Sequence, residues 1–396
     1  MLDNFFPGGA NPANDTHIDN GAFTSLAQAI ETLRPAKPLY VLYPEIIRKT
    51  AEHFCRAFPG KTLFAVKTNP EAVVLDAVSE GGVYAFDVAS LEEIVRVKSR
   101  YPAAEIYFMH PVKAPEDIRA AYFDYGVRNF VLDCKDELFK VLRETDLAQD
   151  LNIFIRLALP KNDKAMIDFS SKFGADRKEA IALLRETRHV AGSLSISFHV
   201  GTQTTDCAKY SAAIDYTADL VREAGVKIDS LNVGGGFPVA YEGDGLVCSV
   251  EDCVKAIKGA LKRHGWQAMP LLAEPGRVLV AKGASLVTRI ELRKGETLYI
   301  NDGIYGGLFD ACDWLGLNYP VKAFTSDRAF DGDMQDYRMA GPTCDSLDMM
   351  QGPFSLPSDI GMGDWVIFEN TGAYSSVLRS NFNGFGHADM VCVYSK

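Results

Sequence analysis

Long apolar runs are missing from this sequence, since no stretch of about 18 apolar residues occurs anywhere, and this excludes a membrane-spanning helix. The opening stretch from Met1 to Pro7 lacks the basic start and the long apolar core of a signal peptide. Blocks of lysine and arginine are absent, and a formal net charge of -11 gives no basic field for nucleic acid or anionic lipid. We expect a cytoplasmic protein that binds neither nucleic acid nor membranes.

Paired cysteine motifs are missing as well. The eight cysteines contain no CxxC pair, which removes support for a zinc site or for thioredoxin-like chemistry. We therefore expect no metal site, with most thiols acting as small buried apolar groups in a reducing compartment. The cysteines are Cys55, Cys134, Cys207, Cys248, Cys253, Cys312, Cys344 and Cys392.

The composition is that of a globular protein, with 47% hydrophobic and 23% charged residues. A chain of 396 residues exceeds what one hydrophobic core normally holds, so we expect one large and one smaller domain. Apolar runs alternate with helical patterns from about residue 44 to residue 278, which is typical of parallel strands covered on the outside. We predict an α/β protein whose eight strands close into a (β/α)8 TIM-like barrel, with a doubly wound open sheet as the alternative. The eight runs are residues 63–67, 84–88, 105–110, 129–133, 152–159, 194–199, 231–234 and 271–274.

The pattern changes after about residue 278. Short alternating runs, separated by glycine, aspartate and proline, replace the helical periods. They predict an all-β domain, and the apolar run at residues 38–43 is expected to return and join it. Residues 1–36 are expected to be rich in loops. We divide the chain into a barrel domain of residues 44–278 and a β domain of residues 1–43 plus 279–396.

Polar residues stand where the predicted barrel strands end. In barrels of this kind the chemistry lies at the carboxyl ends of the strands, so these side chains are expected on one rim. One such residue is more often a cap or an ion-pair partner, whereas a full set favours a functional site. The set is Lys67, Asp87, His110, Asp133, Arg156, His199, the turn Gly234-Gly235-Gly236, Glu274 and Arg277.

Two features of this rim point to pyridoxal phosphate. Lys67, between an apolar strand and Thr68-Asn69-Pro70, is placed to lose its proton by desolvation and to form a Schiff base with an aldehyde. The glycine triplet lets backbone N–H groups close around a phosphate, and Arg277 adds a bidentate partner. Glu274 would then contact the pyridine nitrogen and keep it protonated.

Two further rim residues have competing interpretations. His199 is either a hydrogen-bonded structural residue or a ring stacked on the cofactor, and its neighbours favour stacking. Asp87 either belongs to a helix start near Ser90 or pairs with Lys67 or Arg156 at the cofactor. We assign Asp87 and Arg156 to the cofactor site.

These residues form a pattern that resembles the barrel-fold pyridoxal phosphate decarboxylases of the alanine-racemase-like group, fold type III, and among them the eukaryotic-type ornithine decarboxylases. The resemblance runs in the family's order over residues 38–385. The matching stretches are Phe64-Ala65-Val66-Lys67-Thr68-Asn69-Pro70, Phe86-Asp87-Val88-Ala89-Ser90, Lys172-Phe173-Gly174, Phe198-His199-Val200-Gly201, Gly234–Pro238, Ala273-Glu274-Pro275-Gly276-Arg277, Asn301-Asp302-Gly303, Gly341-Pro342-Thr343-Cys344-Asp345-Ser346, Gly372-Ala373-Tyr374 and Phe382-Asn383-Gly384-Phe385.

The resemblance implies a role for each matching residue. Lys67 would bind the cofactor covalently, Glu274 would contact its ring nitrogen and His199 would stack on its ring. Cys344 would protonate the carbanion after carbon dioxide leaves. Residues that would hold the phosphate are Thr202, Gly235, Gly236, Arg277 and Tyr374. The family also implies a homodimer in which Cys344 and Asp345 reach the site from the partner subunit.

The resemblance also implies a substrate with an amine tail. Asp345 would bind that distal amine, and Phe382 would line the apolar pocket that receives the carboxylate. Residues 299–317 contain no arginine or lysine, which argues against the distal carboxylate of diaminopimelate. L-Ornithine, giving putrescine and carbon dioxide in polyamine biosynthesis, is the predicted substrate.

One position departs from the family. Counting from Tyr305, the second acid that ornithine decarboxylases place near the distal amine falls on Trp314, with Asp313 one residue earlier and Asp310 four earlier. We assign Asp313 and Tyr305 to the substrate site. A decarboxylase of lysine or another diamino acid is the enzymatic alternative, and a catalytically silent regulatory paralogue is the alternative from another class.

Overall fold

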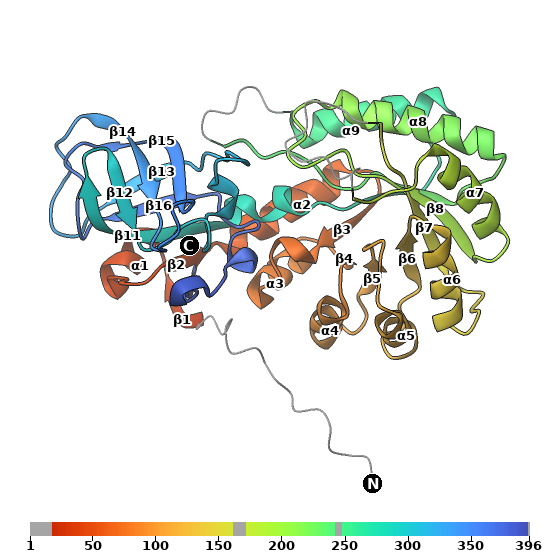
Figure 1. Ribbon diagram of the computed structural model, residues 1–396, viewed down its shortest axis with the longest axis horizontal. Coiled ribbons are helices and arrows are strands. Elements are labelled where there is room, and N and C mark those ends of the chain that lie inside the picture. Colours follow the sequence, from red (N-terminus) through yellow and green to blue (C-terminus); the bar gives the residue numbers. More distant parts are fainter. Residues whose placement is uncertain (1–17, 161–171, 242–247, 395–396) are drawn as a thin grey trace, which may run out of the picture. The chain divides into compact units, whose positions relative to one another are not determined.

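The computed structural model describes residues 18–160, 172–241 and 248–394 of the chain, which form two compact units (Figure 1). One unit runs from Ile46 to Ala240 and continues up to Val280. The other combines the described chain up to Glu45 with Tyr241 and the chain from Ala281 onward. The division of the sequence at residues 44 and 278 stays our proposal for the domain limits.

Eight parallel strands of the first unit close into a barrel, in the order β10-β3-β4-β5-β6-β7-β8-β9. The predicted barrel is confirmed, and the open doubly wound sheet is wrong because β10 pairs with β3 and closes the sheet. Every predicted apolar run overlaps one strand. The strands are β3 (Lys61–Ala65), β4 (Ala85–Val88), β5 (Glu105–Phe108), β6 (Asn129–Leu132), β7 (Asn152–Arg156), β8 (Ser193–Ser197), β9 (Ser230–Asn232) and β10 (Leu271–Ala273).

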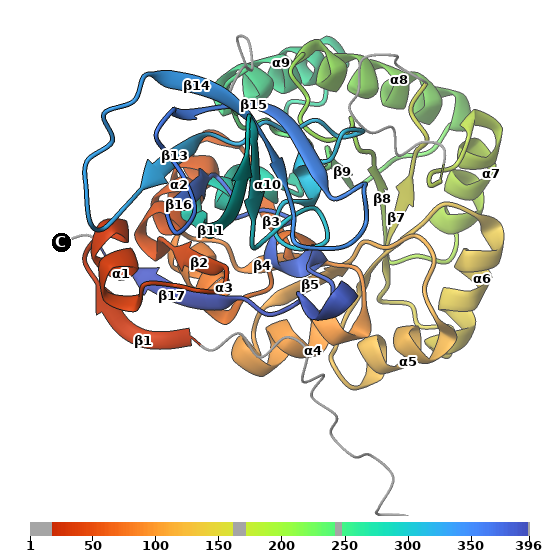
Figure 2. The same cartoon turned by 60° about the vertical axis from the view of Figure 1, so that its left-hand side comes forward.

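Helices between these strands form the outer layer of the barrel, as the ring from α4 to α9 in Figure 2 shows. Several begin at a residue whose side chain accepts a backbone N–H, such as Ser90 before α4 and Asp176 before α7. Ser249 and Asp252 form a reciprocal capping box at the start of α9. The helices are α2 (Pro44–Ala57), α3 (Ala72–Glu80), α4 (Leu91–Arg100), α5 (Pro115–Phe123), α6 (Lys135–Glu144), α7 (Arg177–Arg188), α8 (Ala208–Ala224), α9 (Val250–Arg263) and α10 (Arg277–Val280).

Apolar side chains fill the inside of the barrel. Leu63, Val131 and Phe154 belong to one buried cluster contributed by different strands. Burial of an aliphatic or aromatic side chain of this size stabilises the fold by about 1.5 to 3 kcal/mol. Because the interior is occupied in this way, polar side chains are left to gather at the strand ends.

The second unit is built on a nine-stranded mixed sheet. The predicted strand at residues 38–43 does join it, since β2 pairs antiparallel with β11 and parallel with β17. Its strands are β1 (Ile18–Phe23), β2 (Leu39–Leu42), β11 (Ala284–Lys294), β12 (Thr297–Ile300), β13 (Val321–Phe324), β14 (Met334–Ala340), β15 (Met349–Pro357), β16 (Trp365–Glu369) and β17 (Asp389–Val393).

The prediction that residues 1–36 are rich in loops is wrong for their described part. Strand β1 is followed by helix α1 (Leu26–Leu33), whose start is capped by Ser25, and residues 1–17 lie outside the described residues. Ala29 and Ile30 of α1 are fully buried in the core of the sheet unit. The sequence did contain a helix signal here, since Leu26, Ala29, Ile30 and Leu33 stand at helical spacing after the capping Ser25.

Among the described helices, none has both the length and the hydrophobicity that a bilayer crossing needs.

Candidate active site

Five predicted residues lie together at the carboxyl ends of the barrel strands. Lys67 follows β3, Asp87 lies in β4 and Arg156 ends β7. His199 and Glu274 follow β8 and β10. The charges of Lys67 and Arg156 reach both His199 and Glu274, which places the five in one electrostatic neighbourhood.

Lys67 forms an ion pair with Asp87, with 2.9 Å between Nζ and Oδ2. The Asp87 side chain is 2% exposed and the Lys67 side chain 49% exposed, so the amine is accessible while its carboxylate partner is buried. The predicted strand extends to residue 67, but β3 ends at Ala65. The N–H of Asn69 bonds to the carbonyl of Val66, which closes a short helical turn and takes Lys67 out of the strand.

The carboxyl group of Glu274 titrates close to neutral pH. Desolvation is the main cause that raises its pKa, to about 7, and the charge of Asp87 adds to it, whereas Lys67, Arg156 and a hydrogen bond act in the opposite direction. That hydrogen bond comes from the amide of Asn232, at 2.7 Å from Oε1 of Glu274. Such a carboxyl can either hold or release a proton.

Asn232 is a site residue that the sequence reasoning missed. It ends β9, it is fully buried, and its side-chain oxygen accepts the N–H of Gly234 at 2.9 Å. The available signal was a polar residue inside the apolar run that precedes the glycine triplet. Buried polar groups of this kind are nearly always hydrogen-bonded, so such a residue predicts a partner at the strand end.

His199 carries a neutral imidazole ring. Desolvation lowers its pKa to about 3, and the nearby charges of Arg156 and Lys67 contribute in the same direction. Its Nδ1 accepts the N–H of Gly201 at 3.1 Å, so the ring proton belongs on Nε2. A neutral ring fixed in this way is suited to lie against another aromatic ring.

The glycine turn after β9 forms a tight backbone cradle. A Cβ atom on Gly235 would lie 2.7 Å from the carbonyl oxygen of Glu274 and 3.1 Å from Nε2 of His199. A Cβ atom on Gly236 would lie 2.4 Å from the carbonyl oxygen of Gly201, and its φ is +94°. Only glycine fits both positions, because other parts of the protein already occupy the space that a Cβ atom would fill.

Neighbouring segments hold this cradle in place. The N–H of Thr204 donates to the carbonyl of Gly236 at 2.9 Å, which ties the turn to the loop that contains Thr202. The hydroxyl of Tyr210 in α8 donates to the carbonyl of Gly235, also at 2.9 Å. Arg277 begins α10 just beyond Glu274. Tyr210 was not anticipated from the sequence, because a tyrosine inside a helix has no pattern that distinguishes it from core.

The barrel residues fit pyridoxal phosphate. Lys67 offers an amine that can react with the aldehyde. Glu274 offers a carboxyl group that can share a proton with the ring nitrogen, and His199 offers a neutral ring that can stack on the cofactor. Gly235 and Gly236 present no side chain at the turn after β9, and the backbone N–H groups of such glycine turns bind phosphate groups.

Four predicted residues lie together in the other unit. The hydroxyl of Tyr305 donates to Oδ2 of Asp345 at 2.5 Å, and the rings of Tyr305 and Phe382 are 4.9 Å apart. The backbone N–H of Cys344 donates to Oδ1 of Asn383 at 3.1 Å. We call Tyr305, Cys344, Asp345 and Phe382 the Tyr305 cluster. Hydrogen bonds from the Leu347 backbone and from Tyr305 lower the pKa of Asp345, so its carboxylate is ionised.

Three other acidic or aromatic residues of this unit, Asp310, Asp313 and Trp314, differ in their burial. Asp313 and Trp314 are exposed, the Trp314 ring is 6.2 Å from that of Phe309, and Asp310 is buried. Within the described part of the chain, no hydrogen bond or ring contact joins Asp313 or Trp314 to the Tyr305 cluster. Tyr374 lies in the loop after β16, with a left-handed φ of 55°.

Two other rim residues accept hydrogen bonds from nearby backbone. The Asp133 carboxylate accepts the N–H of Gly174 at 2.8 Å, and Nδ1 of His110 accepts the N–H of Val112 at 3.2 Å. The described residues contain no cluster of three or more histidine, cysteine, aspartate or glutamate side chains arranged to hold a metal ion.

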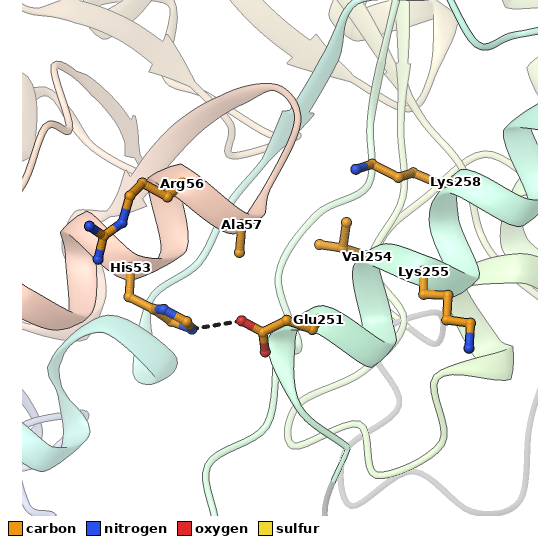
Figure 3. A pocket seen from close by; sticks show the side chains of 7 residues that line it. All are labelled: His53, Arg56, Ala57, Glu251, Val254, Lys255 and Lys258. Carbon is orange, nitrogen blue, oxygen red and sulfur yellow. Dashed lines mark ion pairs between the residues drawn. The ribbon is translucent and has the colours of Figure 1, made fainter.

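A pocket of about 480 Å³ lies elsewhere on the barrel, between α2 and α9 (Figure 3). Nε2 of His53 and Oε1 of Glu251 form an ion pair of 2.9 Å at its edge, and both side chains are more than half exposed. None of the predicted site residues lines it. The pocket therefore does not belong to the candidate active site.

Known proteins with similar sequences and structures agree with this geometry. The family model for the pyridoxal binding domain of pyridoxal-dependent decarboxylases matches residues 45–281. A lysine/ornithine decarboxylase of Selenomonas ruminantium is 30% identical over 91% of this chain and 89% of its own length. Antizyme inhibitor 2 of Xenopus laevis is 31% identical over 86% of this chain and 77% of its own length.

A solved structure extends the likeness to the whole fold. The arginine decarboxylase of Paramecium bursaria Chlorella virus, bound to agmatine, superimposes with a TM-score of 0.80 at 27% identity and covers 92% of this chain and 98% of its own. The family match covers more than half of the chain, and a decarboxylase relative at 30% identity spans most of it. This chain therefore belongs to the pyridoxal-dependent decarboxylases of the alanine-racemase fold, and pyridoxal phosphate is its cofactor.

Proposed function

We propose that this enzyme removes the α-carboxylate of a basic L-amino acid, and that L-ornithine, which yields putrescine and carbon dioxide, is its preferred substrate. The observation that carries the proposal is the ionised Asp345, fixed by Tyr305 beside Phe382. An ammonium tail pairs with such a carboxylate, whereas a distal carboxylate finds no arginine or lysine in residues 299–317. The lysine/ornithine and arginine decarboxylases among its relatives support a basic substrate.

The barrel residues have distinct tasks in this proposal. When bound, pyridoxal phosphate delocalises the electron pair that remains on the substrate after the carboxylate leaves. Glu274 holds a proton at the ring nitrogen, His199 stacks on the ring, and Asp87 orients the amine of Lys67, which binds the cofactor. Arg156 adds positive charge to the same rim. The proposed phosphate ligands are Thr202, Gly235, Gly236, Arg277 and Tyr374.

The Tyr305 cluster acts on the substrate in this proposal. Phe382 lines the apolar pocket that receives the α-carboxylate, and loss of water from that carboxylate favours its release. The thiol of Cys344 then donates a proton to the carbon that has lost the carboxylate. We propose that the cluster serves the site of the partner subunit, in a head-to-tail homodimer of the cytoplasm.

Two observations support alternatives. Trp314 takes the place at which a second acid is expected, and Asp313 lies next to it, so a pocket rebuilt for lysine or another diamino acid is the second candidate. Antizyme inhibitor 2 among the relatives supports a regulatory role for a chain of this fold. Lys67 and Cys344 are both present, which favours catalysis.

Release of carbon dioxide tests the proposal. Purified protein loaded with cofactor is assayed in parallel with ornithine, lysine, arginine, 2,4-diaminobutyrate and diaminopimelate. We expect the highest kcat/KM for ornithine. A higher value for another diamino acid would replace the substrate and keep the chemistry, and no release from any of them by protein that binds cofactor would favour the regulatory role.

A further inference from the structure

Three thiols gather at the starts of two neighbouring barrel helices. Cys207 precedes α8 and Cys253 lies in the first turn of α9, with 3.0 Å between their sulfur atoms. Cys248, just before α9, contacts the Cys207 thiol and directs its own Sγ to the carbonyl of Thr205 at 2.9 Å. We call Cys207, Cys248 and Cys253 the thiol cluster. All three are free cysteines.

Cys207 and Cys253 are positioned for a covalent bond to each other. A disulfide has an S–S distance of about 2.05 Å, so the two sulfurs need to approach by roughly 1 Å. Helices α8 and α9 lie side by side in both views (Figures 1 and 2), and the Ser211 hydroxyl of α8 donates to the Ala256 carbonyl of α9 at 3.0 Å. This packing holds α8 against α9 and keeps the two thiols next to each other.

The thiol cluster is coupled to the glycine cradle through two short connections. Tyr210, in the first turn of α8, bonds to the carbonyl of Gly235. Thr204 bonds to Gly236 and is followed by Thr205, whose carbonyl accepts the Cys248 thiol. A change at Cys207 therefore acts on the segments that hold both glycines of the cradle.

We propose that Cys207 and Cys253 form a site of oxidative modification, a reversible disulfide that restrains the cradle and slows the loss of pyridoxal phosphate. With hydrogen peroxide as oxidant, the two S–H bonds and the O–O bond break, one S–S bond forms, and two molecules of water leave with both protons. The effect on the cofactor rests on the proposed role of Gly235 and Gly236, whereas disulfide formation does not.

Neither thiol is ionised at neutral pH. Burial raises the pKa of Cys253 to about 11 and also raises that of Cys207, whose thiol neighbours act in the same direction. Because the thiolate is the reactive form, oxidation is slow at neutral pH and is faster at pH 8.5, where the small thiolate fraction is larger. Cys207 is half-buried, so the oxidant has access to one of the two partners.

Peptide mapping after oxidation tests the disulfide directly. The cofactor-loaded protein is treated with hydrogen peroxide at pH 8.5, blocked with an alkylating reagent and digested, with reduced protein in parallel. We expect a Cys207–Cys253 cross-linked peptide that dithiothreitol removes, and none in Cys207→Ser. Cys134→Ser is the matched control, because Cys134 occupies the same position before α6 and is also half-buried. A cross-link between Cys207 and Cys248, or sulfinic acid without a cross-link, would overturn the proposal.

Cofactor release is the second measurement. Oxidised and reduced proteins are diluted into a trap for free cofactor, and the visible absorbance of bound cofactor is followed. We expect release to slow by about 3-fold or more after oxidation, because a cross-linked segment opens less often, and to be unchanged in Cys207→Ser. Equal rates in protein shown to carry the cross-link would overturn the coupling. Neither readout depends on the amino acid that the enzyme decarboxylates.

Discussion

Asn232 joins two parts of the barrel rim, since its amide donates to Glu274 at 2.7 Å while its side-chain oxygen accepts the N–H of Gly234. The carboxyl assigned to the ring nitrogen and the first glycine of the cradle are thus held by one buried residue. Since that hydrogen bond favours the ionised carboxylate, Asn232 limits how far burial raises the pKa of Glu274.

The substitution Asn232→Leu is expected to raise the pKa of Glu274 further. A hydrogen bond to a charged group contributes about 1.5 to 3 kcal/mol, so loss of this one raises the pKa by about 1 or more. The infrared band of the protonated carboxyl, followed against pH in cofactor-free protein, measures this. The control is Asn152→Leu, which removes a side-chain hydrogen bond from Asn152 to Asn129 and leaves Asn232 intact. An unchanged titration in Asn232→Leu would show that the amide has no influence on Glu274.

Substitutions of Lys67 separate its covalent role from its ion pair. Lys67→Ala removes both, so we expect loss of the visible absorbance of bound cofactor, activity lower by more than about 100-fold, and a free energy of unfolding lower by about 1 kcal/mol. Lys67→Arg keeps a cation beside Asp87 and is expected to recover stability without absorbance or activity. Wild-type absorbance in Lys67→Ala would contradict the assignment.

The two aspartates of residues 310–314 are expected to differ in their effect on substrate binding. Asp313 is exposed and next to Trp314, whereas Asp310 is buried. Asp313→Ala should raise the KM for ornithine by about 10-fold or more through loss of a charge-assisted contact. Asp310→Ala should lower the melting temperature and leave KM nearly unchanged. The reverse order of KM values would assign the distal amine to Asp310.

Mixed subunits test whether active sites are shared. Lys67→Ala and Cys344→Ala proteins are each expected to be inactive. If sites combine residues of two subunits and exchange is free, an equal mixture forms heterodimers with one intact site each and recovers about a quarter of the wild-type activity. Mass spectrometry of labelled subunits verifies the exchange. Demonstrated exchange without recovered activity would place both residues in one subunit's site.

His199 is expected to make the cofactor-free protein sensitive to acid. Its pKa is lowered to about 3 in the folded chain from the ordinary 6.5, so only the unfolded chain binds the proton between these values. Its contribution to stability is therefore complete above pH 6.5 and falls as the pH drops towards 3. Between pH 7 and pH 5 the wild type should lose about 1 to 2 kcal/mol more than His199→Asn in urea unfolding.

The contribution of Glu274 to stability has the opposite pH dependence. For this reason His199→Asn is compared with the wild type at each pH. Its pKa is raised from 4.5 to about 7, so its contribution is present below pH 4.5 and is lost as the pH rises through 7. The difference between the two proteins isolates His199. Parallel stability curves for wild type and His199→Asn would contradict the low pKa.

The sequence by itself determined the alternation of parallel strands with covering helices and the polar residues at the strand ends. Nearly continuous apolar runs that alternate with helical periods indicate a parallel sheet covered by helices, and the carboxyl ends of such strands share one edge. The pairing of β10 with β3 decided that this sheet closes into a barrel. Lys67, Asp87, Arg156, His199 and Glu274 could be named for that reason, before any coordinate. The periodicity of α1, at Leu26, Ala29, Ile30 and Leu33, was also present in the sequence but was overlooked.

Tertiary structure alone decided the contacts that set the chemistry. Asn232 reaches Glu274 across 42 positions of sequence, and Tyr210 reaches Gly235 across 25. Cys207 and Cys253, 46 positions apart, meet only because α8 packs on α9. Local patterns report burial and period, whereas hydrogen bonds and pKa values depend on which distant side chains the closed barrel brings within reach, and no window of sequence contains that information.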